Sequence, residues 1–457
     1  MKVALIGTGY VGLVTGVCLA DVGHGVTCID RDPAIVDSLG RGIPTIHEAG
    51  LEELLARDIA AGAIRFSSDI AAISDAGIVM LAVGTPTDPQ SGETDLSAIM
   101  AALRAIAPHL RDDAVIAVKS TVPVGTNRRL AEEMGRLRPH FGGSVVSNPE
   151  FLREGTAIAD FFGADRIVCG VRNENARRRM AELYRPLAAR GVRLVFTTPE
   201  NAELAKYASN AFLATKLAFV NEMADLCEAS GANVADVAAL MGMDQRIGSA
   251  FLNAGPGFGG SCFPKDIASL RTSAAQRGVA LRLVDATIAA NAARKQSMAD
   301  RVLAELAGPG LRRVAVLGIS FKAGTDDVRE SPALDVIGRL LEAGLEVHAH
   351  DPQARRAGAP ELAGVRWFDR PIDATRGAAA TVVMTEWPQY KAMSLAELAA
   401  SMSGKLLFDM RNILSPSAAR GAGLDYRCIG GGGEARGMWL STDIPPLAPA
   451  RILVAGE

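Results

Sequence analysis

The chain has 457 residues, of which 49% are hydrophobic and 22% charged, and its formal net charge is −3. This length allows two or three domains with full cores, and the composition is that of an ordinary globular protein. The small negative charge gives no electrostatic case for nucleic acid or an anionic membrane as partner. No uninterrupted apolar stretch reaches the roughly 18 residues that a membrane-spanning helix needs.

The cysteines indicate a reducing compartment. The six cysteines are scattered along the chain without a Cys-x-x-Cys pair, at positions 18, 28, 169, 227, 262 and 428. Such spacing is not that of a disulfide framework. The apolar run after Met1-Lys2 could suggest a signal peptide, but the glycines within it and Asp21 argue against one. We therefore expect a cytoplasmic protein.

The first thirty residues predict a dinucleotide-binding βαβ unit. Residues 2–6 are typical of a buried parallel strand, residues 11–22 of a helix, and residues 26–29 of a second strand. The turn between strand and helix is Gly7-Thr-Gly9-Tyr-Val-Gly12. Gly7 permits the tight turn, Gly9 lets a pyrophosphate approach, and Gly12 lets the helix pack on the strand. The N-terminus of the helix would offer free N–H groups to the phosphates.

Asp30 ends the second strand and favours NAD over NADP. A carboxylate in this position accepts hydrogen bonds from the ribose hydroxyls and repels a 2′-phosphate. The adjacent Arg31 could receive that phosphate, but we interpret it as a solvated surface residue.

Three more apolar strands are predicted at 76–83, 114–118 and 145–146. Each leads into a polar loop, at residues 84–87, 119–125 and 147–155. Ligands bind beyond the carboxyl ends of the strands in an open parallel sheet, so all three loops are expected on the cofactor side.

The middle of the chain predicts long helices around a cysteine loop. Residues 199–229 are helical in pattern and carry an apolar stripe, and residues 283–307 read as another helix. The large apolar surface of these helices suggests a subunit interface. Lys206 and Asn210, four residues apart in the first helix, share a face and can reach the same ligand. Between the two helices, Cys262 lies in the glycine-rich segment 257–266. We expect Lys265 and Lys206 to lower the pKa of this thiol, whereas the simpler interpretation is a buried thiol that fills space.

The opening pattern returns near residue 313. Residues 313–318 and 342–351 echo residues 2–7 and 21–30, but the second copy lacks the glycine fingerprint and carries Lys322 instead. This predicts a second Rossmann-like domain that binds another phosphorylated group through Lys322, with Arg329 as a further phosphate contact. His348 and His350 resemble a metal pair without a third ligand, so we expect structural histidines and no metal.

The predicted fold class is therefore α/β, with two Rossmann-like, doubly wound parallel-sheet domains joined by a central helical segment. The expected limits are 1–198 for the NAD-binding domain, 199–308 for the helical, dimerising segment with the cysteine loop, and 309–432 for the sugar-nucleotide domain. Residues 433–457 form a tail without an assigned role.

These motifs resemble the nucleotide-sugar 6-dehydrogenases, the UDP-glucose and GDP-mannose dehydrogenases, from residue 1 to about 430. The matching segments are 7–12, 147–155, Lys206-x-x-x-Asn210, 251–255, 259–266, Phe321-Lys322 and Arg329-Glu-Ser. Arg246-Ile-Gly followed by Phe251-Leu-Asn resembles the UDP-glucose branch.

The resemblance implies a four-electron oxidation of UDP-glucose to UDP-glucuronate that consumes two NAD and one water in a homodimer or higher oligomer. Cys262 would form a thiohemiacetal and then a thioester. Lys206 and Asn210 would stabilise oxyanions, Asp266 and Thr121 would order the hydrolytic water, and Glu154 would be a general base.

The resemblance also implies two sets of binding residues. Those for NAD are Gly7, Gly9, Tyr10, Val11, Gly12, Asp30, Thr85, Pro86, Thr121, Glu154, Lys265 and Arg329. Those for the UDP-sugar are Glu150, Phe151, Leu152, Arg153, Glu154, Lys206, Asn210, Arg246 from the neighbouring subunit, Phe251, Leu252, Asn253, Ala254, Gly255, Phe258, Gly259, Lys322 and Arg411.

Two departures and several alternatives stay open. Ile35 stands where many relatives carry a basic residue, and the tail after Gly430 has no counterpart. GDP-mannose or UDP-N-acetylmannosamine could replace UDP-glucose as substrate. A two-electron NAD(P) dehydrogenase or reductase would not need Cys262, and an NAD-binding redox sensor would leave Lys206, Asn210 and Lys322 unexplained.

Overall fold

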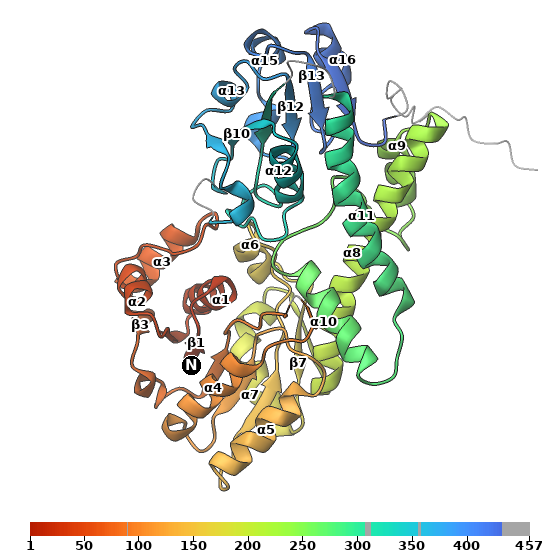
Figure 1. Cartoon of the computed structure of the whole chain (residues 1–457). Coiled ribbons are helices and arrows are strands. Elements are labelled where there is room, and N and C mark those ends of the chain that lie inside the picture. Colours follow the sequence, from red (N-terminus) through yellow and green to blue (C-terminus); the bar gives the residue numbers. More distant parts are fainter. Residues whose placement is uncertain (89, 307–311, 355–357, 432–457) are drawn as a thin grey trace, which may run out of the picture.

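The computed structural model describes residues 1–88, 90–306, 312–354 and 358–431. The predicted tail at 433–457 lies outside these residues. Two sheets and a set of long helices make up the described chain (Figure 1). The predicted α/β class with two Rossmann-like domains and a helical connection is confirmed.

The first sheet has the strand order β3-β2-β1-β4-β5-β6-β7-β8. Its strands are β1 (Lys2–Ile6), β2 (Gly25–Ile29), β3 (Ile64–Ser67), β4 (Ile78–Leu81), β5 (Val115–Val118), β6 (Ser144–Ser147), β7 (Arg166–Gly170) and β8 (Arg193–Thr197). The helices are α1 (Tyr10–Asp21), α2 (Pro33–Gly40), α3 (Leu51–Ala60), α4 (Ser97–Ile106), α5 (Thr126–Leu137), α6 (Ala157–Phe162) and α7 (Glu174–Ala188).

Helices cover both faces of this sheet, which explains why its strands read as continuous apolar runs. In β1, Val3 and Leu5 belong to one core cluster, while Ala4 and Ile6 belong to another on the opposite face. The sheet departs from all-parallel order at one place, because β6 meets β7 antiparallel through Ser147 and Gly170. The sequence reasoning predicted neither β7 nor β8.

The second sheet has the order β11-β10-β9-β12-β13-β14, which repeats the order of the first six strands. Its strands, all parallel in their described pairings, are β9 (Arg313–Leu317), β10 (Glu346–His350), β11 (Arg366–Trp367), β12 (Ala380–Val383), β13 (Leu406–Asp409) and β14 (Asp425–Cys428). Its helices are α12 (Pro332–Glu342), α13 (Pro371–Ala374), α14 (Pro388–Lys391), α15 (Leu395–Ser401) and α16 (Pro416–Gly421).

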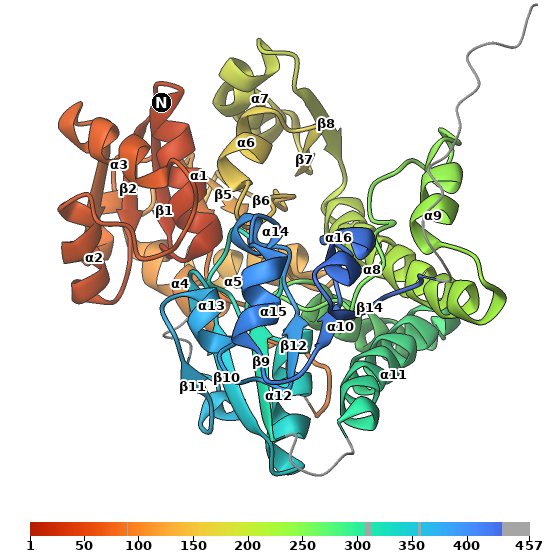
Figure 2. The same ribbon diagram turned by 90° about the horizontal axis from the view of Figure 1, so that it is seen from above.

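The central helices are α8 (Pro199–Ser230), α9 (Val234–Gly242), α10 (Phe263–Ala275) and α11 (Arg282–Glu305). Figure 2 shows α8, α9 and α11 together on one side of both domains. Val220 of α8 and Met298 of α11 are buried in the same cluster as Val314 of β9, so these helices complete the core of the second domain. Within the described ranges, no helix combines the length and apolar character needed to cross a membrane.

Candidate active site

The glycine-rich loop after β1 leaves space open on its outer side. Gly7 has φ 94°, which favours glycine, and a Cβ on Gly12 would lie 1.9 Å from the carbonyl oxygen of Gly7. A Cβ on Gly9, in contrast, would meet no atom within 4 Å. The loop thus has the geometry that a dinucleotide pyrophosphate requires: a tight turn, close helix packing and an unobstructed backbone.

Asp30 lies at the end of β2, beside this loop. Its Oδ2 accepts hydrogen bonds from the backbone N–H and the hydroxyl of Thr8, at 2.9 and 2.7 Å, and its Oδ1 accepts from the N–H of Asp32. Partial burial alone would raise the pKa of Asp30, but these hydrogen bonds lower it below the usual value. The carboxylate is therefore ionised, partly exposed and able to accept further hydrogen bonds.

Glu154 is the point where the three parts of the chain meet. Its carboxylate accepts a hydrogen bond from Ser261 of the cysteine loop at 3.1 Å and from Thr325 of the second domain at 3.2 Å. Arg329 approaches it at 4.0 Å. Burial and the nearby Asp327 raise the pKa of Glu154, so its proton can exchange closer to neutral pH than that of an ordinary glutamate.

The predicted lysine of α8 forms a buried ion pair. Lys206 Nζ lies 3.1 Å from Glu150 Oε1, and the two side chains are 5% and 6% exposed. The ammonium also lies 5.3 Å from the ring centroid of Phe151. Burial opposes the charge of Lys206, but Glu150 and Asp266 raise its pKa, as Cys262 would if ionised, so the ammonium stays charged. Glu150, expected only as a substrate contact, thus lies beside the main cation of the site.

Asn210, one turn further along α8, holds a carboxylate in place. Its side-chain nitrogen donates to Asp266 Oδ2 at 2.7 Å, while Lys265 contacts the other oxygen, Oδ1, at 2.5 Å. Asp266 is 1% exposed and lies in the first turn of α10, the helix that begins directly after Cys262. The amide of Asn210 therefore orients Asp266 and is not pointed freely at a substrate oxygen.

The prediction of a lowered pKa for Cys262 is wrong in its net direction, although Lys206 has the expected effect. Burial, with Glu150 and Asp266, raises the pKa of the thiol to about 11, although Lys206 acts in the opposite direction. Lys265, the other predicted lysine, pairs with Asp266 at 2.5 Å. The thiol is therefore protonated at neutral pH and needs a base or a change in local charge to become a nucleophile.

The glycines of the cysteine loop are required by the close approach of the second domain. A Cβ on Gly259 would lie 2.2 Å from the carbonyl oxygen of Glu330. Gly260 has φ 84° and donates its N–H to the carbonyl oxygen of Arg329 at 2.8 Å. Backbone contact thus fixes Cys262 against the segment that follows β9.

Side chains of the second domain line the other side of this junction. Lys322 is partly buried, and this burial lowers its pKa while Glu154 counteracts the shift. Arg411 donates to the carbonyl oxygens of Phe321 and Met384 at 2.8 Å and pairs with Glu386 at 3.2 Å. Because a Cβ on Gly255 would lie 3.2 Å from Arg411, this arginine borders the segment 251–255, as the predicted substrate set requires.

Three residues around this junction have strained backbones. Phe251, Glu330 and Asn412 have φ of 62°, 54° and 55°, and they are the non-glycine residues with positive φ among those that the structure describes. Such conformations cost free energy and concentrate at functional sites.

The remaining predicted residues lie in several places. Thr85 donates to the carbonyl oxygen of Thr121 at 2.8 Å, which joins the loops after β4 and β5. Arg246 is exposed and hydrogen-bonds to Asp244, so this chain does not place it in its own site. His348 and His350 are buried and contact Ala374 and Tyr390. Among the described residues, neither histidine belongs to a group of metal-ligating side chains.

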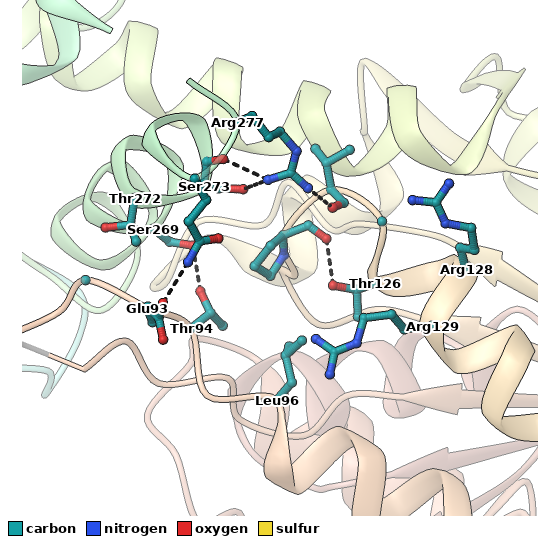
Figure 3. A pocket seen from close by; sticks show the side chains of 15 residues that line it. Glu93, Thr94, Leu96, Thr126, Arg128, Arg129, Ser269, Thr272, Ser273 and Arg277 are labelled. Carbon is teal, nitrogen blue, oxygen red and sulfur yellow. Dashed lines mark hydrogen bonds between the residues drawn. The ribbon is translucent and has the colours of Figure 1, made fainter. Parts of the chain in front are cut away.

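A hollow of about 410 Å³ lies at the other end of α10, and its lining contains none of the predicted catalytic residues. Figure 3 shows Arg277 there with hydrogen bonds to Ser273 and to the carbonyl oxygen of Val124, at 2.8 Å for the latter. Gln276 donates to Glu93 at 2.6 Å. These contacts tie the C-terminus of α10 to the first domain and so help to fix the helix that begins after Cys262.

The fold and the site together define an α/β protein with one open dinucleotide loop and a partly buried thiol between two nucleotide-type domains. Models of the UDP-glucose/GDP-mannose dehydrogenase family match along the chain: the NAD binding domain at 1–188, the central domain at 200–293 and the UDP binding domain at 315–416. The chain belongs to this family.

Individual proteins and solved structures of the same family are also similar to this chain along most of its length. A UDP-glucose 6-dehydrogenase from Rhizobium meliloti is 46% identical over 94% of this chain and 99% of its own length, and one from Pseudomonas aeruginosa is 40% identical over 94% and 97%. The solved structure of a UDP-glucose dehydrogenase from Pyrobaculum islandicum is 36% identical, with a TM-score of 0.86 over 93% of this chain and 96% of that one. A UDP-D-ManNAc dehydrogenase from Pyrococcus horikoshii is 26% identical, with a TM-score of 0.84 over 94% and 100%.

Proposed function

We propose that this protein oxidises carbon 6 of UDP-glucose to the carboxylate of UDP-glucuronate, with two NAD and one water consumed per sugar. The observation that carries this proposal is the position of Cys262, beside Lys206 and Asp266, where an open dinucleotide domain meets a second nucleotide-type domain. The choice of UDP-glucose over related sugars rests on the 46% and 40% identical relatives of that name.

The residues present fit NAD. The backbone at Gly9 is unobstructed, and Asp30 keeps an ionised, partly exposed carboxylate for the ribose hydroxyls. Thr121 and Glu154 lie on loops that would border the reactive end of the cofactor. When bound, NAD accepts a hydride from carbon 6 in each of the two oxidations.

In the first oxidation, Lys206 would stabilise negative charge on the oxygen at carbon 6 while that oxygen loses its proton. Glu150, at 3.1 Å from Lys206, and Glu154, with its raised pKa, are the candidate bases for this proton. The resulting aldehyde would lie within reach of Cys262.

In the second oxidation, the thiol of Cys262 would lose its proton and add to the aldehyde as a thiohemiacetal, which becomes a thioester after hydride loss. Because the pKa of the thiol is about 11, this addition needs a base nearby. Asp266, oriented by Asn210 at 2.7 Å, would then activate the water that hydrolyses the thioester, with Thr121 as a further contact.

The uridine diphosphate would bind to the second domain. Lys322 is a partly buried cation available there for a phosphate, and Arg411 borders the segment 251–255 that would enclose the sugar. The division at residues 198, 308 and 432 stays a prediction.

We also propose that the protein acts as a homodimer through α8. Phe212, Phe219 and Leu226 recur every seven residues on this helix and are 67%, 44% and 59% exposed. An exposed apolar stripe of this kind is typical of a protein–protein interface. The same stripe on a second copy of the chain could pack against it across a two-fold axis. Arg246 would then reach the site of the neighbouring subunit. Phe212→Glu should shift the sedimentation coefficient toward the monomer, and an unchanged value would contradict this interface.

All six cysteines are free thiols, which supports the expected cytoplasmic location.

The proposed reaction is tested by offering NAD with UDP-glucose, GDP-mannose or UDP-N-acetylmannosamine and recording NADH absorbance until the sugar is consumed. We expect the highest kcat/KM with UDP-glucose and two NADH per sugar. One NADH per sugar would indicate a two-electron dehydrogenase, and no NADH with any sugar would favour a redox sensor. A higher kcat/KM with GDP-mannose or UDP-N-acetylmannosamine would refute the substrate assignment.

A further inference from the structure

Lys119 is a buried lysine beside the proposed catalytic residues that the mechanism above does not use. It follows β5 directly and is 6% exposed. Its backbone N–H donates to Leu81 at 2.8 Å, and the N–H of Asn148 donates to Val118 at 2.8 Å. Lys119 therefore lies at the carboxyl end of β5, next to the segment after β6 that carries Glu150.

Three titratable groups act on its ammonium, each from a different element. Glu150 after β6 attracts it, while Lys206 of α8 repels it, and Cys169 of β7 would attract it if ionised. Within the described residues, no hydrogen-bond acceptor is paired with its Nζ, so Glu150 is its principal compensation. Burial lowers the pKa of Lys119 to about 8, and Glu150 only partly offsets this shift.

The charge of this cluster bears on what Lys206 can do. An isolated Lys206–Glu150 pair, at 3.1 Å, has no net charge and would stabilise an oxyanion poorly. With Lys119 protonated, the two lysines and one carboxylate carry a net charge of one positive unit. A buried group of this net charge favours negative charge on a nearby oxygen because the surroundings screen it weakly.

We propose that Lys119 is a positioning residue that supplies the net positive charge of the Lys206–Glu150 cluster. Its attraction to Glu150 would offset part of the charge of that carboxylate, so that the ammonium of Lys206 can act on the oxygen at carbon 6. This role rests on the proposed function. Loss of the proton from Lys119 would leave Lys206 neutralised by Glu150, so kcat falls as the pH rises through about 8.

The test compares Lys119→Arg and Lys119→Met with the native enzyme in kcat profiles between pH 6.5 and 9.5, with both substrates saturating. Lys119→Met should lower kcat at pH 7 by about 10- to 100-fold, less than removal of a direct oxyanion donor, with both KM values nearly unchanged. Lys119→Arg, which stays charged throughout, should retain most of the activity at pH 7 and lose the decline near pH 8.

Two results would overturn the proposal: a Lys119→Met enzyme with native kcat, or a Lys119→Arg enzyme whose alkaline decline has the native midpoint. If Lys119→Met does not fold, the pH midpoint of the alkaline decline of kcat in Lys119→Arg alone decides whether the proposal holds. The assay uses whichever sugar nucleotide the native enzyme oxidises best, so an error in the substrate assignment appears in the native enzyme and not in the comparison of variants.

A readout independent of activity comes from stability. Because the folded pKa of about 8 lies below the unfolded value of about 10.4, the unfolded chain binds more protons between them. Native stability should therefore rise relative to Lys119→Met as the pH increases from 8 to 10. A constant difference across this range would show that Lys119 is not a buried, titrating cation, and the proposal would fail.

Discussion

Each Rossmann-like domain has a turn after its first strand and a carboxylate beside that turn, but the two carboxylates differ in their contacts and exposure. In the first domain, Asp30 accepts from the N–H and hydroxyl of Thr8 and stays partly exposed. In the second, Asp351 Oδ2 accepts from the N–H of Ile319 at 2.7 Å and from the N–H and hydroxyl of Ser320 at 3.0 Å. Asp351 is buried, and the indole N–H of Trp387 lies 3.3 Å from the same oxygen.

The same strand-end carboxylate therefore has two functions. Where Gly9 leaves the first turn open, the carboxylate is free to receive ribose hydroxyls. In the corresponding place, Ser320 and Trp387 donate hydrogen bonds to Asp351, so this carboxylate is occupied by contacts within the protein. This difference explains why Lys322, beyond the turn, is the expected nucleotide contact of the second domain.

The glycines of the first turn give the largest expected effect. Gly12→Ala would place a Cβ 1.9 Å from the carbonyl oxygen of Gly7, so we expect a loss of about 4 kcal/mol in unfolding free energy and no NAD binding. Gly9→Ala is the matched control: its Cβ points into open space, so stability should hold while the KM for NAD rises. Thermal unfolding and NAD titration check both, and a stable Gly12→Ala that binds NAD would contradict the packing described.

The two carboxylates provide the next comparison. Asp351→Ala leaves several buried donors unpaired and should cost about 3 kcal/mol, with no change in cofactor preference. Asp30→Ala should cost less stability and raise kcat/KM for NADP relative to NAD, by about tenfold. Denaturant unfolding and cofactor kinetics separate the two effects. Equal use of NADP and NAD by the native enzyme would show that the role given to Asp30 is wrong.

Lys322→Ala tests the second domain alone. Loss of a charged phosphate contact of about 1.5–3 kcal/mol should raise the KM for the sugar nucleotide by about 10- to 100-fold. The KM for NAD should stay unchanged because the first turn is intact. Steady-state kinetics with each substrate varied in turn provide the measurement, and a rise confined to the KM for NAD would reverse the assignment of the two domains.

The smallest effect concerns the pH dependence of Cys262. Since its pKa is raised to about 11, the thiolate fraction should increase about tenfold per pH unit from pH 7 to 10. The rate of alkylation by iodoacetamide, followed by mass spectrometry of the peptide containing Cys262, should rise accordingly. A plateau near pH 8 would mean that the surrounding cations outweigh burial and the two carboxylates.

Local patterns in the sequence predicted the fold class and the family. The glycine fingerprint, the repeated strand before Gly318 and the glycines around Cys262 each specify a backbone conformation within a few residues. The contacts of Glu154 with Ser261 and Thr325 join segments more than 100 residues apart, so no local pattern contained them.

The same limit applies to burial and charge. Lys265 is three residues from Cys262, but its ammonium pairs with Asp266, a partner that proximity in the sequence to Cys262 did not reveal. Lys119 follows a strand like any loop residue, and its burial depends on how β5, β6 and α8 pack together. The antiparallel join of β6 to β7 likewise arises from tertiary pairing that strand periodicity does not encode.

The central claim is that Cys262 forms a covalent bond with the sugar, and NADH counting with Cys262→Ala tests it most directly. We predict two NADH per UDP-glucose for the native enzyme and a fall of at least about 10³-fold in the rate of the overall oxidation for the variant, with binding of both substrates retained. Cys227→Ala, which removes a buried thiol from the core cluster of the second domain, is the control and should remain active. A Cys262→Ala protein that forms two NADH per sugar near the native rate would contradict the account.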